Sequence, residues 1–372
     1  MKAQGIDVIN MSVGEPDFMT PGHVKEAGKK AIDDNFSKYS PVPGYPVLRE
    51  AIVKKLKQEN HLDYAVSEIV VGTGGKQGVC NAILALANPG DEVIIPAPYW
   101  VSYPQMVKLA GGVPVIVSAG IEQDFKITAE QLEHAITPKT KMIILCSPSN
   151  PTGSVYSAEE LESLAKVVLA HDDLFVLSDE IYEHINYIGG HCSIASCQGM
   201  KDRTILCNGV SKAYAMTGWR LGWIAAPEWI AKGINKLQGQ YTSGTCSVSQ
   251  MAAVAAYEAD QACVADYREA FRRRRDLIVR LAKEIPGLEV NVPQGAFYLF
   301  PKCSSYFGKT DGKHVIRSSS DLAMYILEEG CVATVGGDAF GAPECFRMSY
   351  ATSDDNIKEA LRRIKEVLSK LK

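Results

Sequence analysis

Two cations, Lys212 and Arg220, stand in a stretch of the sequence that otherwise resembles a protein interior. Between Thr204 and Pro227 every other residue is apolar, small or neutral. A buried ammonium is costly unless a partner neutralises it or it loses its proton. Because this stretch contains no carboxylate, we expect the partner to come from elsewhere in the chain or from a bound ligand.

Polar segments follow five predicted strands, at the point where each strand ends. The pairs are "EIVV" (68–71) with "GTGGKQ" (72–77), "EVII" (92–95) with Tyr99-Trp100, "MIIL" (142–145) with "SPSNPTG" (147–153), "FVLS" (175–178) with "DEIYEH" (179–184), and "TILC" (204–207) with "NGVSK" (208–212). In a parallel sheet the carboxyl ends of strands share one edge, and open α/β folds bind ligands there. We therefore expect these segments to form one site.

Together these polar groups suit one ligand. Glycine amides and Arg220 would hold a phosphate, Trp100 would stack on a flat ring, Asp179 would keep a ring nitrogen protonated, Asn150 and Tyr182 would bind a ring oxygen, and Lys212 would form a Schiff base with an aldehyde. These features describe pyridoxal 5′-phosphate (PLP), which would neutralise both cations. Each segment alone has a simpler interpretation: a tight turn for "GTGGKQ", a helix cap at Asp179, a surface lysine, or an Asp179–Arg220 ion pair.

The composition excludes several classes of protein. The 372-residue chain has a net charge of −4, which argues against a nucleic-acid binder. The basic run "RRRR" (272–275) lies in a helical pattern, and we interpret it as a solvated helix face. Ten cysteines without C-x-x-C spacing predict reduced core thiols and no metal site. No stretch approaches the roughly 18 apolar residues of a membrane span, so we expect a soluble, cytoplasmic protein.

The order of predicted elements indicates an α/β protein. Apolar strands alternate with helical patterns from about residue 69 to 226, which favours a mostly parallel sheet with helices on both faces. After residue 260 a long helix (about 261–285) leads into a closing amphipathic helix through predicted short strands, which favours a smaller α+β domain. These strands are "LEVNV" (288–292), "AFYLF" (296–300), "CVAT" (331–334) and "FRMSYA" (346–351). We predict a large domain at 16–260 and a small domain formed by 1–15 and 261–372.

At this point the sequence resembles the class I (fold-type I) PLP-dependent aminotransferases, most closely their bacterial aspartate aminotransferase branch. The resemblance covers nearly the whole chain and rests on an ordered set of motifs: "SVGEPDF" (12–18), "KYSPVPGYPVLREA" (38–51), "GTGGKQ" (72–77), "PYWVSYP" (98–104), "SPSNPTG" (147–153), "SDEIYE" (178–183), "SKAYAMTGWRLG" (211–222), "GAFY" (295–298) and "FRMSYATS" (346–353). It implies a homodimeric enzyme that moves amino groups by a ping-pong mechanism through a Schiff base on Lys212.

The resemblance also implies a role for each matched residue. Lys212, Asp179 and Tyr182 would be catalytic; Gly75, Lys76, Ser211 and Arg220 would surround the phosphate; Trp100 would stack on the ring; Asn150 would bind the ring oxygen; Gly14, Lys76, Trp100, Asn150 and Arg347 would bind the substrate; and Tyr39 would reach the partner subunit's phosphate. Arg347 would grip the substrate α-carboxylate through two parallel hydrogen bonds.

The sequence departs from the family pattern in two places. Gly209 stands where well-known members have serine, which removes one phosphate contact. The sequence starts near the end of the family's first helix, at "KAQGIDV", so we expect the arm that clasps the partner either to be missing or to lie outside this sequence.

Lys76 is the cation available for a second substrate carboxylate, because the loop 238–245 has no arginine. We therefore expect transfer from L-aspartate to 2-oxoglutarate. Prephenate, aromatic amino acids and alanine stay open as substrates, as does a PLP-dependent β-lyase reaction.

Overall fold

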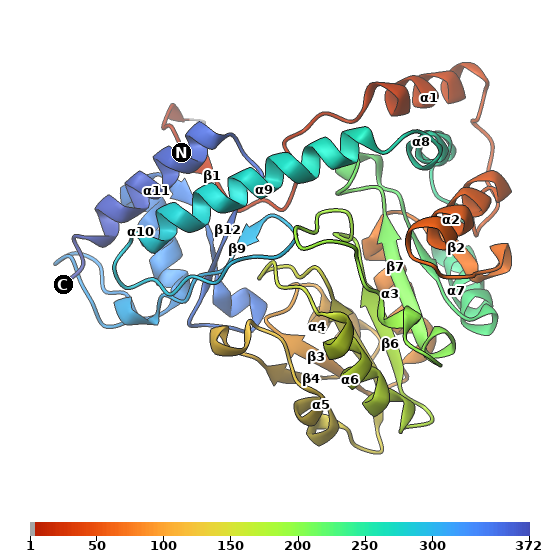
Figure 1. Cartoon of the computed structure of the whole chain (residues 1–372), viewed down its shortest axis with the longest axis horizontal. Helices are drawn as coiled ribbons and strands as arrows, with labels where there is room; N and C mark the ends of the chain where they lie inside the picture. The colour runs from red at the N-terminus through yellow and green to blue at the C-terminus, as the bar shows by residue number, and fades with distance from the viewer. Residues whose placement is uncertain (1–3) are drawn as a thin grey trace.

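A computed structural model describes residues 4–372, and Figure 1 shows their arrangement. Seven strands form the main sheet, in the order β2 (Ile69–Gly72), β8 (Gly222–Ala225), β7 (Thr204–Gly209), β6 (Phe175–Asp179), β5 (Thr140–Cys146), β3 (Glu92–Ala97) and β4 (Val113–Ser118). Only β8 runs against its neighbours in this sheet. The five predicted strands are therefore present as β2, β3, β5, β6 and β7, within two residues at each end.

Helices cover both faces of this sheet, as continuous apolar strands require. One face packs on α3 (Gly75–Leu86), α4 (Tyr103–Leu109) and α7 (Glu228–Tyr241). The other face packs on α1 (Gly22–Asp33), α2 (Pro46–Glu59) and α8 (Ser247–Glu258), and farther along on α5 (Ala129–Ala135) and α6 (Ala158–Leu169). Alternate residues of β6 serve the two faces: Leu177 packs toward α3 and Val176 toward α6.

A second core lies at the other end of the molecule. The parallel pair β1 (Ile9–Asn10) and β10 (Val332–Ala333) and the antiparallel β11 (Val335–Gly336), β12 (Phe346–Ser349) and β9 (Tyr298–Leu299) pack with α9 (Ala262–Lys283), α10 (Ser319–Gly330) and α11 (Asp354–Leu368). In Figure 1, α9 spans the distance between the two ends. Because this second core is separate from the large sheet, we propose that the chain divides into the two domains predicted from the sequence. Residues 1–3, assigned to the small domain, lie outside the described residues.

Some expectations about single segments are wrong. "LEVNV" (288–292) is no regular strand, and only Glu289 forms an isolated bridge. In the "RRRR" run, Arg272 and Arg273 are exposed, whereas Arg274 pairs with Asp17 and keeps 12% of its side chain exposed. Arg275, equally covered, donates to the Pro293 carbonyl. Half of the predicted solvated face therefore joins α9 to neighbouring segments.

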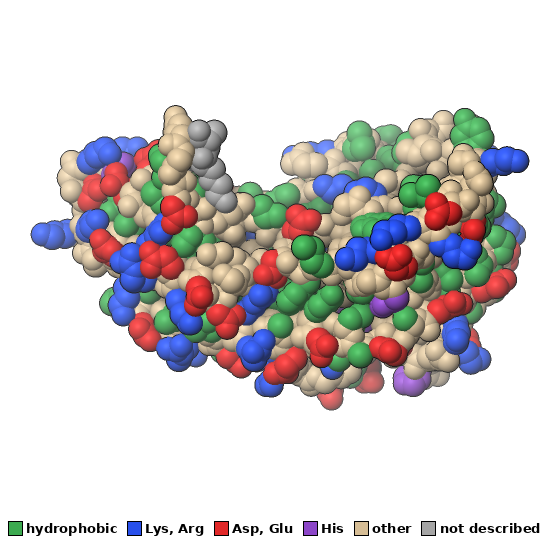
Figure 2. Space-filling view, turned by 90° about the horizontal axis from the view of Figure 1, so that it is seen from above, with side chains coloured by type: hydrophobic (Ala, Val, Ile, Leu, Met, Phe, Trp, Pro, Cys, Tyr) green, Lys and Arg blue, Asp and Glu red, His purple; other side chains and the backbone are tan. Residues whose placement is uncertain are grey.

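The surface and the cysteines are mixed in character. On the face drawn in Figure 2, Lys and Arg side chains lie interspersed with Asp and Glu. The ten cysteines are free thiols, but Cys192 and Cys246 are exposed and do not belong to the core. Among residues 4–372, no helix is both long and apolar enough to cross a membrane.

Candidate active site

A cavity of about 460 Å³ lies where the carboxyl ends of the large sheet meet β9, β11 and β12. Its lining includes eleven of the predicted site residues: Gly14, Gly75, Lys76, Trp100, Asn150, Asp179, Tyr182, Ser211, Lys212, Arg220 and Arg347. The strand-end segments thus meet along one edge, as parallel strands dictate. Tyr39, the remaining predicted residue, lies outside this lining and is 98% exposed.

The glycines at one end of the cavity form a cradle for an anion. Gly74, the residue just before α3, has a φ of +80°, and a Cβ there would lie 2.6 Å from Arg220 Nη2. A Cβ on Gly222 would lie 2.2 Å from the amide nitrogen of Gly75. The first N–H groups of a helix have no partner within it, and the helix dipole favours an anion there. The cradle suits a phosphate.

Arg220 completes this cradle from the solvent side. Its guanidinium donates to the carbonyls of Thr217 (2.8 Å) and Thr73 (3.4 Å) and makes no ion pair within residues 4–372. The residue is exposed. The interior position expected for Arg220 is therefore wrong: its turn, with a φ of +54°, carries it to the rim of the cavity.

Asp179 lies buried at the end of β6, beneath the cavity. Tyr103 donates its hydroxyl to Asp179 Oδ2 at 2.7 Å, so the alternative of a structural pair with Arg220 is wrong. Burial raises the pKa of the Asp179 carboxyl, while the Tyr103 hydrogen bond and the Lys212 charge act in the opposite direction. A cationic group above Asp179 would supply the missing counter-charge.

Lys212 occupies the middle of the cavity. Its amino group donates to the Gly14 carbonyl at 2.7 Å. Burial lowers the pKa of this ammonium to about 8, Asp179 opposes the shift, and Arg220 and Arg347 add to it. At pH 7.4 about a fifth of the amine is therefore neutral, against about a thousandth for an ordinary lysine, and this neutral form can act as a nucleophile or proton acceptor.

Arg347 forms the opposite wall and is buried. Its guanidinium lies 4.6 Å from the ring centre of Tyr298 and 4.8 Å from that of Phe340. Nη1 donates to Asn150 Oδ1 at 2.9 Å and Nη2 to the Ser12 carbonyl at 2.6 Å. Its buried Nε has no partner within residues 4–372. This fixed, incompletely paired fork suits a carboxylate.

Two tyrosines complete the site, although the sequence analysis gave them no role. Tyr103 supports Asp179, and Tyr298 shares a hydrogen bond of 2.7 Å between its hydroxyl and that of Tyr182. A Cβ on Gly14 would lie 2.3 Å from the Tyr298 hydroxyl, so glycine there admits the tyrosine. Both belong to recognised motifs, "PYWVSYP" and "GAFY", and these motifs were the only signal that pointed to them.

Lys76 is the cation on the α3 side of the cavity. Its amino group lies 4.8 Å from the ring centre of Trp100, within the range of a cation–π contact. Both side chains line the cavity. The pair gives this wall a positive charge on a flat aromatic surface.

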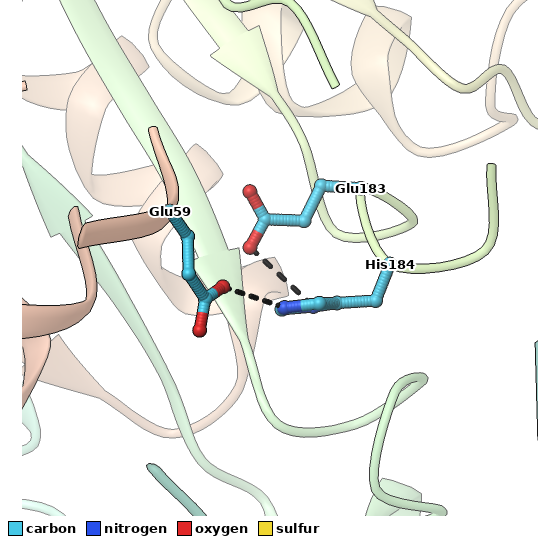
Figure 3. A group of neighbouring side chains, drawn as sticks. All are labelled: Glu59, Glu183 and His184. Atoms are coloured by element: carbon cyan, nitrogen blue, oxygen red, sulfur yellow. Dashed lines mark hydrogen bonds and ion pairs between the residues drawn. The ribbon is translucent and has the colours of Figure 1, made fainter. Parts of the chain in front are cut away.

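A group of potential metal ligands lies outside the cavity. Glu59, Glu183 and His184 bring their ligand atoms within 4.8 Å of one another. Figure 3 shows the three side chains and the contacts of His184 with both glutamates. The Lys55 ammonium pairs with both glutamates and supplies the positive charge that a metal would bring. We therefore interpret this group as an ion-pair network.

The residues around the cavity fit PLP. The glycine cradle with Arg220 matches a phosphate, the buried Asp179 carboxylate matches a pyridinium nitrogen, and the Lys212 amine matches an aldehyde. The unpartnered Nε of Arg347 leaves a donor for a substrate carboxylate.

Comparisons with known proteins agree with this chemistry. The family model "Aminotransferase class I and II" matches residues 6–364. An "Aspartate/prephenate aminotransferase" of Cereibacter sphaeroides is 49% identical over 98% of this chain and 92% of the relative. The crystal structure of an aspartate aminotransferase from Rhizobium meliloti has a TM-score of 0.97 and 45% identity, covering 100% of this chain and 94% of that one. An aspartate aminotransferase from Thermus thermophilus, with maleate, has a TM-score of 0.92 and 41% identity, over 98% of this chain and 93% of that one.

Proposed function

Because the chain belongs to the class I and II aminotransferase family, whose class I members depend on PLP, we propose that it transfers the amino group of L-aspartate to 2-oxoglutarate. The observation that carries the proposal is one cavity with a low-pKa lysine, a buried carboxylate and three further cations, Lys76, Arg220 and Arg347. Arg347 would bind the α-carboxylate of each substrate in turn, as a ping-pong reaction requires.

The chain's own residues would hold the cofactor and the reacting atoms. The α3 amides, Ser211 and Arg220 would bind the phosphate, and Lys212 would bind the aldehyde carbon. Trp100 would cover one ring face, while Asn150 and Tyr182 would bind the ring oxygen. When bound, PLP supplies an electron sink that makes the substrate Cα proton acidic. Asp179 would keep the ring nitrogen protonated, which maintains that sink.

Lys212 would then act as the acid–base group. Displaced by the substrate amine, its neutral nitrogen would accept the proton from the substrate Cα and deliver it to the cofactor carbon that had carried the aldehyde. The low pKa of the Lys212 amine, about 8, suits both steps near neutral pH. The Gly14 carbonyl, which accepts a hydrogen bond from Nζ, would keep the amine near the reacting atoms.

The preference for a dicarboxylic substrate rests on the two ends of the cavity. Arg347 offers a fork for the α-carboxylate, and Lys76 offers a second cation for the distal one. The Thermus thermophilus relative was crystallised with maleate, itself a dicarboxylate. Thr242 and Ser243 lie outside the cavity lining, and the Thr242 hydroxyl accepts a hydrogen bond from Gln77.

Prephenate is the second candidate substrate. The Cereibacter sphaeroides relative carries both activities in its name. Prephenate also has two carboxylates, and the apolar side chains of Val101, Val335 and Phe340 offer a wall for its ring.

We also propose that the active unit is a homodimer. Tyr39 stands almost fully exposed outside the cavity of its own chain, which fits a side chain that completes the site of a second copy. Sedimentation of the loaded enzyme should give a dimer. An active monomer would contradict this proposal.

The absorbance spectrum of the PLP-loaded protein tests the function. Adding L-aspartate should remove the visible band and produce oxaloacetate, and adding 2-oxoglutarate should restore the band. Prephenate in place of 2-oxoglutarate measures the second activity. Lys76→Ala should lower the preference for aspartate over alanine about tenfold, the value of one charge-assisted hydrogen bond; an unchanged preference would remove Lys76 from the proposal.

A further inference from the structure

The turn after β6 presents its side chains to two different environments. Asp179 and Tyr182 line the cavity. Glu180 and Glu183, one residue farther along in each case, are not part of that lining and are 1% and 5% exposed. Asp179 and Glu180 point in opposite directions because side chains alternate along a strand: Asp179 lies on the same face as Leu177, and Glu180 on the same face as Ser178.

Glu183 lies in a closed network anchored on α2. The Lys55 ammonium, with a side chain 2% exposed, pairs directly with its carboxylate. Asn60 accepts from Lys55 at 2.7 Å and donates to Glu183 Oε2 at 2.9 Å. His184 bridges Glu183 and Glu59 at 3.4 and 2.9 Å, as seen in Figure 3.

Glu180, at the start of the turn, is also fixed by contacts with neighbouring side chains. Ser178 and Ser193 donate their hydroxyls to its Oε1 at 2.8 and 2.6 Å. His191 Nε2 lies 2.7 Å from its Oε2. Burial disfavours the charged imidazole of His191, but Glu180 and then Glu183 outweigh that effect and raise its pKa.

The electrostatics show that this network is charged. Burial alone would raise the pKa of Glu183, yet Lys55, His184 and His191 lower it below its usual value. Such a buried pair is weak evidence for added stability, because apolar replacements of similar volume are often as stable. Its directed hydrogen bonds do fix one orientation of the backbone that carries them.

We propose that Lys55 and Glu183 are positioning residues, which hold the turn so that Tyr182 meets the cofactor ring oxygen. The Glu183 amide donates to the Glu180 carbonyl at 2.9 Å, and the Ile185 amide donates to the Tyr182 carbonyl at 2.8 Å. These two backbone hydrogen bonds, one before and one after the anchored Glu183, therefore fix the backbone that carries Tyr182. The inference rests on the proposed function, since it concerns PLP.

Three variants and one control test the inference. Glu183→Gln and Lys55→Met each remove one partner, and Lys55→Met/Glu183→Met replaces the pair by apolar side chains. Lys57→Met is the control, because Lys57 lies on the same helix in an exposed pair with Asp63. Each variant is measured for thermal unfolding, PLP dissociation constant, and the pH titration of the visible absorbance of the bound cofactor.

Glu183→Gln should weaken PLP binding about tenfold and raise the pKa of the absorbance titration by about one unit, a tenfold change in proton affinity. The reason is that a displaced Tyr182 no longer donates a hydrogen bond to the ring oxygen. This oxygen then holds more strongly the proton that it shares with the Lys212 nitrogen. The double variant should regain the unfolding temperature but keep both shifts. Lys57→Met should match the wild type.

Two outcomes would overturn the inference. Variants that unfold at lower temperature while the dissociation constant and the absorbance pKa stay unchanged would make the network purely structural. A double variant that recovers all three values would show that packing, rather than directed bonds, positions Tyr182. If the wild type itself binds no PLP, the proposed function fails first.

Discussion

The two walls of the cavity are built in different ways. The large-domain wall consists of segments that directly follow strands, from Gly75 on α3 to Lys212 after β7. The small-domain wall gathers Gly14, Tyr298 and Arg347 from three distant parts of the chain. Under the proposed function, the first wall would hold the cofactor and the second would bind the substrate carboxylate. Strand ends would then determine the chemistry on PLP, and long-range packing would determine substrate binding.

Removing the central amine of the first wall should have the largest effect. Lys212→Ala should lower kcat at least about a thousandfold, because it removes both the covalent attachment and the proton-transfer group. Steady-state oxaloacetate production measures the loss. Lys232→Ala, at an exposed lysine on α7, is the control. Substantial turnover by the alanine variant would remove Lys212 from the mechanism.

Changing the second wall should affect substrate binding more than chemistry. Arg347→Lys loses the planar fork while keeping the charge, and should raise KM for both substrates about tenfold to a hundredfold. Initial rates at varied substrate measure the split between KM and kcat. Arg362→Lys, at an exposed ion pair with Glu359, should change neither. A fall in kcat at constant KM would contradict the division between the walls.

The pH dependence of cofactor uptake should distinguish Lys212 from surface lysines. Its pKa is lowered from 10.5 to about 8, so the neutral amine that attacks the aldehyde increases about tenfold per pH unit below 8 and is nearly complete above it. The rate of PLP binding by the apoprotein should follow this curve. A rate that keeps rising toward pH 10 would show that the site does not lower the pKa.

The smallest effect should come from the support beneath Asp179. Tyr103→Phe removes a hydrogen bond that lowers the pKa of the Asp179 carboxyl, so this pKa should rise further. We expect kcat to fall about threefold to tenfold, the value of one neutral donor. Tyr99→Phe, at a tyrosine outside the cavity lining, serves as the control. An unchanged kcat would show that Tyr103 only packs against Asp179.

The sequence predicts the first wall better than the second, because the residues of the first wall directly follow predicted strands in the chain. Apolar strands and the polar residues after them are visible within ten residues, as at "FVLS" and Asp179. Pairings such as Tyr182 with Tyr298, 116 residues apart, or Lys55 with Glu183, 128 apart, depend on tertiary packing that no local pattern contains. Arg347 was found only through its motif.

Errors of exposure have the same origin. Arg220 looked buried because its neighbours are apolar, yet a left-handed turn carries it to the rim. Arg274 looked exposed because three other arginines adjoin it, yet it meets Asp17, 257 residues away. In both cases the contacts of the side chain decide its exposure, and these contacts are not local.

Covalent mapping of the cofactor provides the most direct examination of the central claim, that one lysine at the large sheet's carboxyl edge holds PLP. The loaded enzyme is reduced with borohydride, digested, and its peptides are identified by mass. The account predicts a single modified peptide that contains Lys212. Modification of Lys76 or of surface lysines, with Lys212 unmodified, would contradict it.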